Sequence, residues 1–219
     1  MIRKNIDSHG YYIGLLIALI VVFTIPPFLD GDSVFNRILN ISFLLTLLFS
    51  VLIASRSKKL IILAAILAAP VFANSLQNIF SFEIIDVSLI HPIFGIAFVS
   101  LIVYIILQDI FLSKKIDSSL IIGAIALYFL IGFLWGFIYT AIENFYPGSF
   151  LFAASDDHKN QIGALIYFSL TTLTTLGYGD IAPMSPQARS MATIQAVVGQ
   201  IYLTILVARL VGMHIVQKK

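Results

Sequence analysis

Six long apolar segments set the pattern of this 219-residue chain, with polar residues gathered mainly in the stretches between them. Most of the segments approach the roughly 20 residues that a helix needs to cross a bilayer. The third is short and carries Pro70, which membrane helices tolerate as a kink. The pattern predicts an all-α transmembrane protein with six membrane helices, at Tyr11–Phe28, Ile38–Ala54, Leu60–Ala73, Leu89–Leu112, Leu120–Ile142 and Ala192–His214.

The first segment has a second interpretation, because Arg3 and Lys4 precede it as basic residues precede the apolar core of a signal peptide. A cleavage site of small residues should then follow. The chain continues instead with Pro26-Pro27-Phe28-Leu29-Asp30, so we expect a membrane helix here.

The distribution of charge predicts the side of the membrane on which each loop lies. With the N-terminus inside and six crossings, the cytoplasmic side holds ten basic and three acidic residues, against three basic and eight acidic residues outside. Loops rich in Lys and Arg stay in the cytoplasm. We therefore expect a multi-pass protein of the cell membrane, surrounded by the lipid bilayer, with cytoplasmic N- and C-termini. The inner basic residues are Arg3, Lys4, Arg56, Lys58, Lys59, Lys114, Lys115, Arg209, Lys218 and Lys219.

Composition supports the same class and excludes several others. Hydrophobic residues make up 59% of the chain and charged residues 11%, which is more apolar surface than a soluble core could hide. Cysteine is absent, so there is no disulfide and no thiolate metal site. The four histidines lack metal-ligand spacing, and no catalytic triad, phosphate loop or nucleic-acid patch is visible. We expect no enzymatic activity, no organic cofactor and no nucleic-acid partner.

The stretch from Ser169 to Asp180, between the fifth and sixth apolar segments, carries the candidate chemistry. It reads Ser-Leu-Thr-Thr-Leu-Thr-Thr-Leu-Gly-Tyr-Gly-Asp, and non-helical backbone at membrane depth must line a cavity or be buried in protein. A dehydrated cation needs a cage of oxygens, which backbone carbonyls supply if successive C=O groups point the same way. Gly177 and Gly179 permit the left-handed φ values that this requires, and the Thr175 hydroxyl could add an oxygen.

The run Thr175-Leu176-Gly177-Tyr178-Gly179-Asp180 resembles the selectivity filter of potassium channels. Gly-Tyr-Gly-Asp alone is also a common surface turn, but here eight consecutive positions, Thr171–Tyr178, match the family pattern and precede the last apolar segment. One departure is Leu176, where the family usually has valine or isoleucine; its carbonyl is unaffected, but its side chain packs differently. The resemblance implies that K⁺ binds at Thr175, Leu176, Gly177 and Tyr178, with Gly179 completing the filter.

The resemblance also implies a re-entrant pore helix and filter between the fifth and sixth membrane helices. We expect a helix from about His158 to Thr172, capped by Asp156 or Asp157, that crosses only part of the membrane. The negative end of its dipole would then favour a cation near the midplane. Tyr167 and Phe168 occupy the positions of paired aromatics that brace the filter in many family members. Asp180 is the third residue expected to support the filter, and Tyr167 is a candidate hydrogen-bond donor to it.

Several other polar or small residues have open interpretations. The distance of Gly199 from the filter resembles that of the hinge glycine in the family. Gly199 is therefore a candidate site for a bend or for close approach of another helix. Gln195 and Gln200 need a polar partner or water, and either could face a cavity below the filter. Gly132 and Gly136 form a small-xxx-small pair, expected to pack against the last membrane helix. Carboxylates at the outer mouth would concentrate cations: Glu143, Asp156, Asp157 and Asp180.

The sequence thus predicts a four-helix membrane scaffold domain in residues 1–116 and a pore domain in residues 117–219. A homotetramer is expected, because one chain supplies only a quarter of a filter, and the function is passive K⁺ conduction. Leu89–Leu112 contains no Arg or Lys, so steep voltage gating is not expected. Few residues follow the last helix, so we expect no regulatory domain there. The alternatives are a subunit of a K⁺ transporter, which would carry several pore loops per chain, and a non-conducting modulatory subunit.

Overall fold

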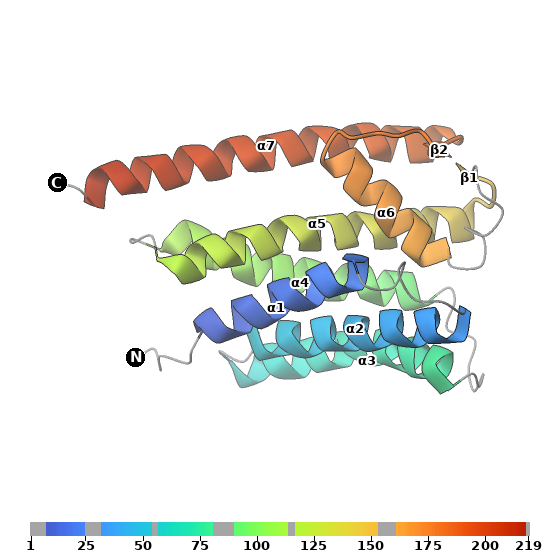
Figure 1. Cartoon of the computed structure of the whole chain (residues 1–219), viewed down its shortest axis with the longest axis horizontal. Helices are drawn as coiled ribbons and strands as arrows, with labels where there is room; N and C mark the ends of the chain where they lie inside the picture. The colour runs from blue at the N-terminus through green and yellow to red at the C-terminus, as the bar shows by residue number, and fades with distance from the viewer. Residues whose placement is uncertain are drawn as a thin grey trace. The chain divides into compact units, whose positions relative to one another are not determined.

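The computed structural model describes residues 8–24, 32–53, 57–80, 90–113, 117–152 and 161–217. These residues form seven α-helices and two three-residue strands, and the chain divides into two compact units. We call Met1–Leu127 the N-terminal unit and Tyr128–Lys219 the C-terminal unit. The boundary falls inside the fifth helix, α5 (Figure 1).

The N-terminal unit contains α1 (Ser8–Thr24), α2 (Asp32–Ile53), α3 (Lys58–Phe80), α4 (Ile90–Leu112) and the first turns of α5 (Ser118–Phe145). α1 contacts α2, α2 contacts α3, and α3 contacts α4. Leucine and isoleucine side chains fill its core, and the Tyr12 hydroxyl of α1 donates a hydrogen bond to the Asp109 carboxylate of α4. Gly14 lets the Phe49 ring of α2 lie directly against the α1 backbone, where a β-carbon would overlap the ring.

The observed helices differ in length from the predicted apolar segments. α3 continues through Pro70 to Phe80, beyond the predicted end at Ala73, and one of its later polar residues, Ser75, is buried. Four helices are long and apolar enough to cross a membrane: Lys58–Gln77, Ile90–Leu112, Ser118–Phe145 and Pro186–Gly212. α1 and α2 carry shorter apolar cores, Gly10–Val22 and Phe43–Ile53, so the first two crossings stay predictions. These findings, drawn from the described residues, are those of a membrane protein.

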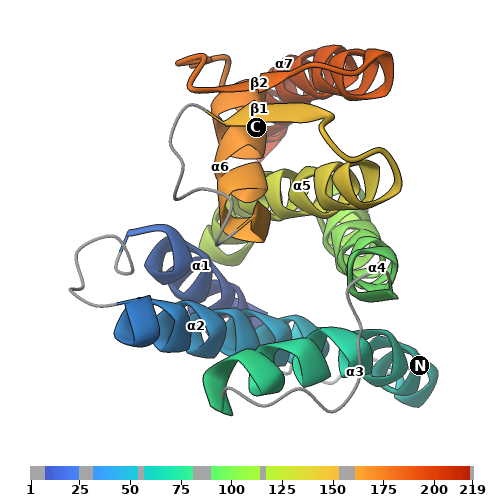
Figure 2. The ribbon, with the colours of Figure 1, turned by 90° about the vertical axis from the view of Figure 1, so that its right-hand side faces the viewer.

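The C-terminal unit is built from the rest of α5, β1 (Phe150–Phe152), α6 (Gln161–Leu173), β2 (Ile181–Pro183) and α7 (Pro186–Gln217). α6 is the short inclined helix that contacts both α5 and α7 (Figure 1). β1 and β2 pair antiparallel, with Leu151 opposite Ala182, and Figure 2 shows them side by side. Because β1 precedes α6 and β2 follows the Thr174–Asp180 stretch, this pairing closes a loop that contains both.

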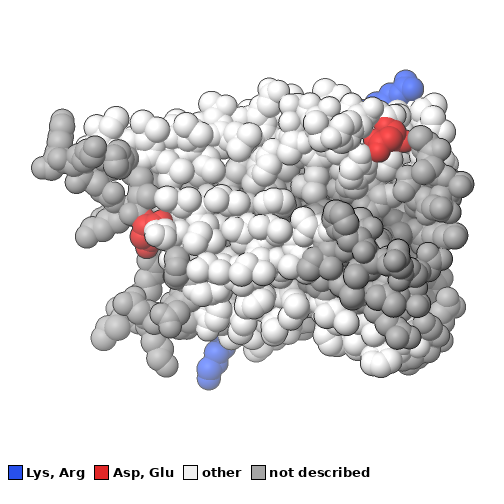
Figure 3. Space-filling model, in the orientation of Figure 1, with Lys and Arg blue, Asp and Glu red and all other residues white. Residues whose placement is uncertain are grey.

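Few charged side chains appear on the face shown in Figure 3, where most of the described surface is uncharged. A charge at the centre of a bilayer costs about 2.5–3.5 kcal/mol on insertion scales, so an uncharged middle is what a membrane helix requires.

Candidate functional site

The C-terminal end of α6 leads directly into the candidate filter. The N–H of Leu176 donates to the Thr171 carbonyl at 2.8 Å, and the N–H of Thr175 donates to the Thr172 carbonyl at 3.0 Å. These two bonds form a Schellman motif, which closes a helix around one residue of left-handed conformation. That residue is Thr175, with φ 59°, an unfavourable conformation for a β-branched residue. The threonine at this helix end is therefore held in strain at the first position of the candidate filter.

Positive φ recurs at every second residue of the candidate filter: 59° at Thr175, 54° at Gly177 and 81° at Gly179. The prediction that both glycines adopt left-handed φ is confirmed. In an ordinary strand successive carbonyls point to opposite sides, and alternating the sign of φ is how a backbone can turn them toward one side. The side chains of Leu176 and Tyr178 are 54% and 69% exposed in the single chain. Neither of these large side chains is covered by the rest of the described chain.

Asp180 at the outer end of this stretch is tied back to α6. The Tyr167 hydroxyl donates to the Asp180 carboxylate at 2.8 Å, which confirms the predicted hydrogen bond. The neighbouring aromatic residue, Phe168, is buried and packs against the rings of Tyr139 and Phe150, with centroid separations of 5.1 and 5.4 Å. Phe168 therefore anchors α6 to α5 and to β1.

Gln195 lies at the centre of a buried polar network that the sequence did not reveal. Its side-chain nitrogen donates to the Ser169 carbonyl at 2.9 Å and contacts the Ser169 hydroxyl at 2.6 Å, and its oxygen accepts from the Tyr139 hydroxyl. The Ser169 hydroxyl in turn donates to the Gly132 carbonyl at 2.6 Å. The interpretation that Gln195 faces a cavity is thus wrong, because its amide is buried between α5 and α6, whereas Gln200 is exposed. Polar residues within the apolar segments were the signal for this network.

Glycines let α6 approach its two neighbours closely. A β-carbon at Gly132 would overlap the Leu170 side chain, and one at Gly136 would lie 2.5 Å from Ile166. The expectation that this pair packs against the last membrane helix is therefore wrong, since both glycines face α6. The predicted close approach at Gly199 is present: a β-carbon there would lie 2.5 Å from the Leu173 carbonyl oxygen. α7 runs unbroken through Gly199, and its role as a hinge stays a prediction.

The inner end of α6 has a further hydrogen-bond partner. The Tyr128 hydroxyl of α5 donates to the Leu173 carbonyl at 3.0 Å, and the Tyr128 ring stacks on Tyr202 of α7 with centroids 5.7 Å apart. Because the last carbonyls of a helix have no partner within the helix, this hydroxyl acts as a cap from outside.

The turn between α5 and β1 is organised by Glu143. Its carboxylate accepts hydrogen bonds from the N–H groups of Gly148 at 2.8 Å and Phe150 at 3.1 Å. The interpretation of Glu143 as an acid facing the outer mouth is therefore corrected: its two oxygens hold a turn in which Gly148 has φ 82°. Asp156, Asp157 and His158, predicted as outer acids or the start of the pore helix, lie outside the described residues, and α6 is described from Gln161.

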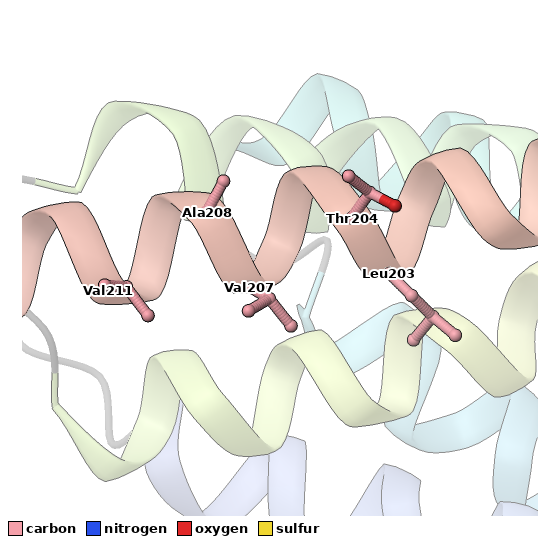
Figure 4. A pocket seen from close by; sticks show the side chains of 5 residues that line it. All are labelled: Leu203, Thr204, Val207, Ala208 and Val211. Atoms are coloured by element: carbon pink, nitrogen blue, oxygen red, sulfur yellow. The ribbon is translucent and has the colours of Figure 1, made fainter.

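The inner half of α7 carries an apolar face. Leu203, Thr204, Val207, Ala208 and Val211 border an open hollow, and Figure 4 shows that all five come from this one helix. A hollow bordered by a single helix is an uncovered surface and not an enclosed ligand site.

These features coincide with the match to known proteins. Residues 120–215 match a family model described as an ion channel. The matched part of the chain includes α6, the Thr174–Asp180 stretch and most of α7. The match supports an ion channel that resides in a membrane. No curated protein and no solved structure matched the chain.

Proposed function

We propose that the protein is a potassium-selective channel that conducts K⁺ passively. The observation that carries the proposal is the recurrence of positive φ at Thr175, Gly177 and Gly179 directly after α6, inside the matched ion-channel domain. In this proposal the carbonyls of Thr175, Leu176, Gly177 and Tyr178 replace the hydration shell of K⁺, with the Thr175 hydroxyl adding an oxygen at the inner end.

The shape of α6 supports a re-entrant path. Its 13 described residues span about 20 Å, less than the roughly 30 Å of the hydrocarbon core. In the proposed arrangement α6 enters the membrane from the outside, and the filter strand returns to the same side. The negative end of the α6 dipole then lies near the inner end of the filter, where it favours a cation.

A homotetramer follows from the geometry of coordination. One strand can present oxygens to only one side of an ion, so four copies of the filter strand are needed to surround it. The exposed side chains of Leu176 and Tyr178 and the apolar face of α7 are the surfaces that neighbouring copies would cover. Their burial on assembly would remove apolar area from water or lipid contact, as in other obligate oligomers.

The helices before the pore serve as a scaffold in this proposal. α4 contains no Lys or Arg, and its ionisable residues are His91 at its beginning and Asp109 near its end. Without basic residues to move through the field, open probability should depend weakly on voltage. The charge distribution supports six crossings of the cell membrane with both termini in the cytoplasm.

Reconstitution tests the proposal. The purified full-length protein would be placed in K⁺-loaded liposomes, and uptake of radioactive Rb⁺ would be followed against protein-free liposomes. We expect uptake that external K⁺ reduces by competition and external Na⁺ does not, together with a tetramer in native mass spectrometry. Rb⁺ uptake no faster than in empty liposomes, or equal competition by Na⁺, would refute potassium-selective conduction.

A further inference from the structure

Three helices of the C-terminal unit share one buried chain of hydrogen bonds. Tyr139 on α5, Ser169 on α6 and Gln195 on α7 each have 0% exposed surface. The bonds run from the Tyr139 hydroxyl through the Gln195 amide and the Ser169 hydroxyl to the Gly132 carbonyl, so the chain begins and ends on α5. The bond from Gln195 to the Ser169 carbonyl, at 2.9 Å, ties α7 to the backbone of α6 as well.

The orientation of the Gln195 amide is fixed by its partners. The Ser169 carbonyl can only accept a hydrogen bond, so the amide nitrogen must face it. The amide oxygen then faces Tyr139, whose hydroxyl donates to it. The site therefore needs a side chain that donates at one side and accepts at the other, at this length. Methionine has a similar shape but neither donates nor accepts in this way, so it would leave the buried Tyr139 hydroxyl and Ser169 carbonyl without this partner.

Gln195 holds α6 close to the point where the candidate filter begins. Ser169 lies in the last turns of α6, and the Schellman bonds connect the end of that helix rigidly to Thr175 and Leu176. A shift of Ser169 relative to α7 would therefore move the first filter carbonyls. Around a fourfold axis the same shift occurs in every copy, so opposing carbonyls change their separation by twice the displacement of one strand.

We propose that Gln195 is a positioning residue for ion selectivity: its amide sets the distance between α7 and α6 and, through α6, the radial position of the carbonyls that coordinate K⁺. The proposal rests on the potassium conduction proposed above. Gln195 does not coordinate the ion in this proposal; it positions the residues that do. Coordination by carbonyls depends on their number and placement, so loosening this tie should reduce discrimination between K⁺ and Na⁺ before it abolishes conduction.

The experiment compares Gln195→Met with wild type in the full-length protein. The K⁺ over Na⁺ permeability ratio would be measured from reversal potentials in planar bilayers, with gel filtration as a check of assembly. Because the substitution removes every hydrogen bond of the Gln195 amide to α5 and α6, we expect the ratio to fall about tenfold or more. The matched control is Gln187→Met, an exposed glutamine in the first turn of the same helix, which should keep the wild-type ratio.

Tyr139→Phe removes one bond of the network with almost no change in volume, so it tests the proposal even if Gln195→Met fails to assemble. We expect a smaller fall in the permeability ratio, about threefold to fivefold, because the bonds between Gln195 and Ser169 remain. Since the Tyr139 hydroxyl acts through Gln195, the double variant should be no less selective than Gln195→Met alone. A selective wild type with unchanged selectivity in Tyr139→Phe, or in an assembled Gln195→Met, would overturn this inference and leave potassium conduction standing. A wild type that does not distinguish K⁺ from Na⁺ would overturn the proposed function.

Discussion

Replacing Gly199 with alanine should force α6 and α7 apart at the C-terminal end of α6. The added β-carbon would lie 2.5 Å from the Leu173 carbonyl oxygen and 2.9 Å from a methyl carbon of the same residue. Neighbouring atoms normally stay at least 3.0 Å from a β-carbon, so a displacement of about 0.5 Å or more is needed. The nearest atom belongs to backbone and cannot turn aside as a side chain can, so a helix has to move.

The magnitude follows from two opposing contributions. Overpacking of a well-filled contact destabilises by about 1–3 kcal/mol, whereas alanine in place of glycine within a helix stabilises by about 1 kcal/mol. The net effect of Gly199→Ala is a loss of about 0–2 kcal/mol. Gly212 on the same helix provides the matched control, because a β-carbon there meets nothing within 4 Å. Gly212→Ala should therefore gain up to about 1 kcal/mol from helix propensity alone.

The assay heats the purified protein in detergent and measures, by gel filtration, the fraction that remains assembled at each temperature. We expect the midpoint temperature of Gly199→Ala to lie below that of Gly212→Ala. The two variants share the gain in helix propensity, so their free energies of unfolding should differ by the overpacking cost alone, about 1–3 kcal/mol. The permeability ratio should fall as well, because Leu173 lies two residues before Thr175. Equal midpoints for the two variants would show that the contact between Gly199 and Leu173 does not constrain the helices.

Three further predictions concern the filter, the outer turn and the scaffold. Gly177→Ala should abolish K⁺ selectivity, because a β-carbon at φ 54° costs about 1–2 kcal/mol; an unchanged reversal potential under K⁺ and Na⁺ would contradict the filter assignment. Glu143→Gln removes an acceptor from the α5–β1 turn and should lower conductance equally in dilute and concentrated K⁺, whereas a loss confined to dilute K⁺ would indicate a surface-charge role. Because α4 lacks basic residues, a conductance–voltage curve should require less than about one gating charge per subunit; a slope that demands several charges would refute the scaffold role.

The sequence predicted what depends on local pattern and on backbone freedom. Apolar length located most of the helices, and the glycines of the Gly-Tyr-Gly run located two of the three positive φ values in the candidate filter. The partner of Asp180 was also predictable, because Tyr167 lies on the helix that leads into the same stretch. Contacts between helices were not, since apolar periodicity does not identify the facing helix: the pair Gly132 and Gly136 faces α6 and not α7.

The hydrogen-bond partners of buried polar residues could not be predicted from the sequence for the same reason. A glutamine in an apolar helix indicates that a partner exists, but only the fold brings Tyr139, Ser169 and Gln195 together across 56 residues of chain. Glu143 was misread because acidic residues near a membrane helix end usually face water. Its two backbone donors arise from a turn whose geometry depends on Gly148.

The ties along α6 explain why so short a helix can hold a filter in place. Tyr167, in the middle of α6, donates to Asp180, Ser169 is bonded to Gln195 two residues later, and Leu173 at the C-terminal end accepts from the Tyr128 hydroxyl. An isolated helix of 13 residues is marginal in stability, so its position has to come from its neighbours. The three ties act on different parts of the stretch that follows, because Tyr167 reaches Asp180 at its far end, whereas Ser169 and Leu173 lie closer along the chain to Thr175. Loosening the Tyr167 tie should therefore affect the Asp180 end of the candidate filter, whereas loosening the Ser169 or Leu173 tie should affect the Thr175 end.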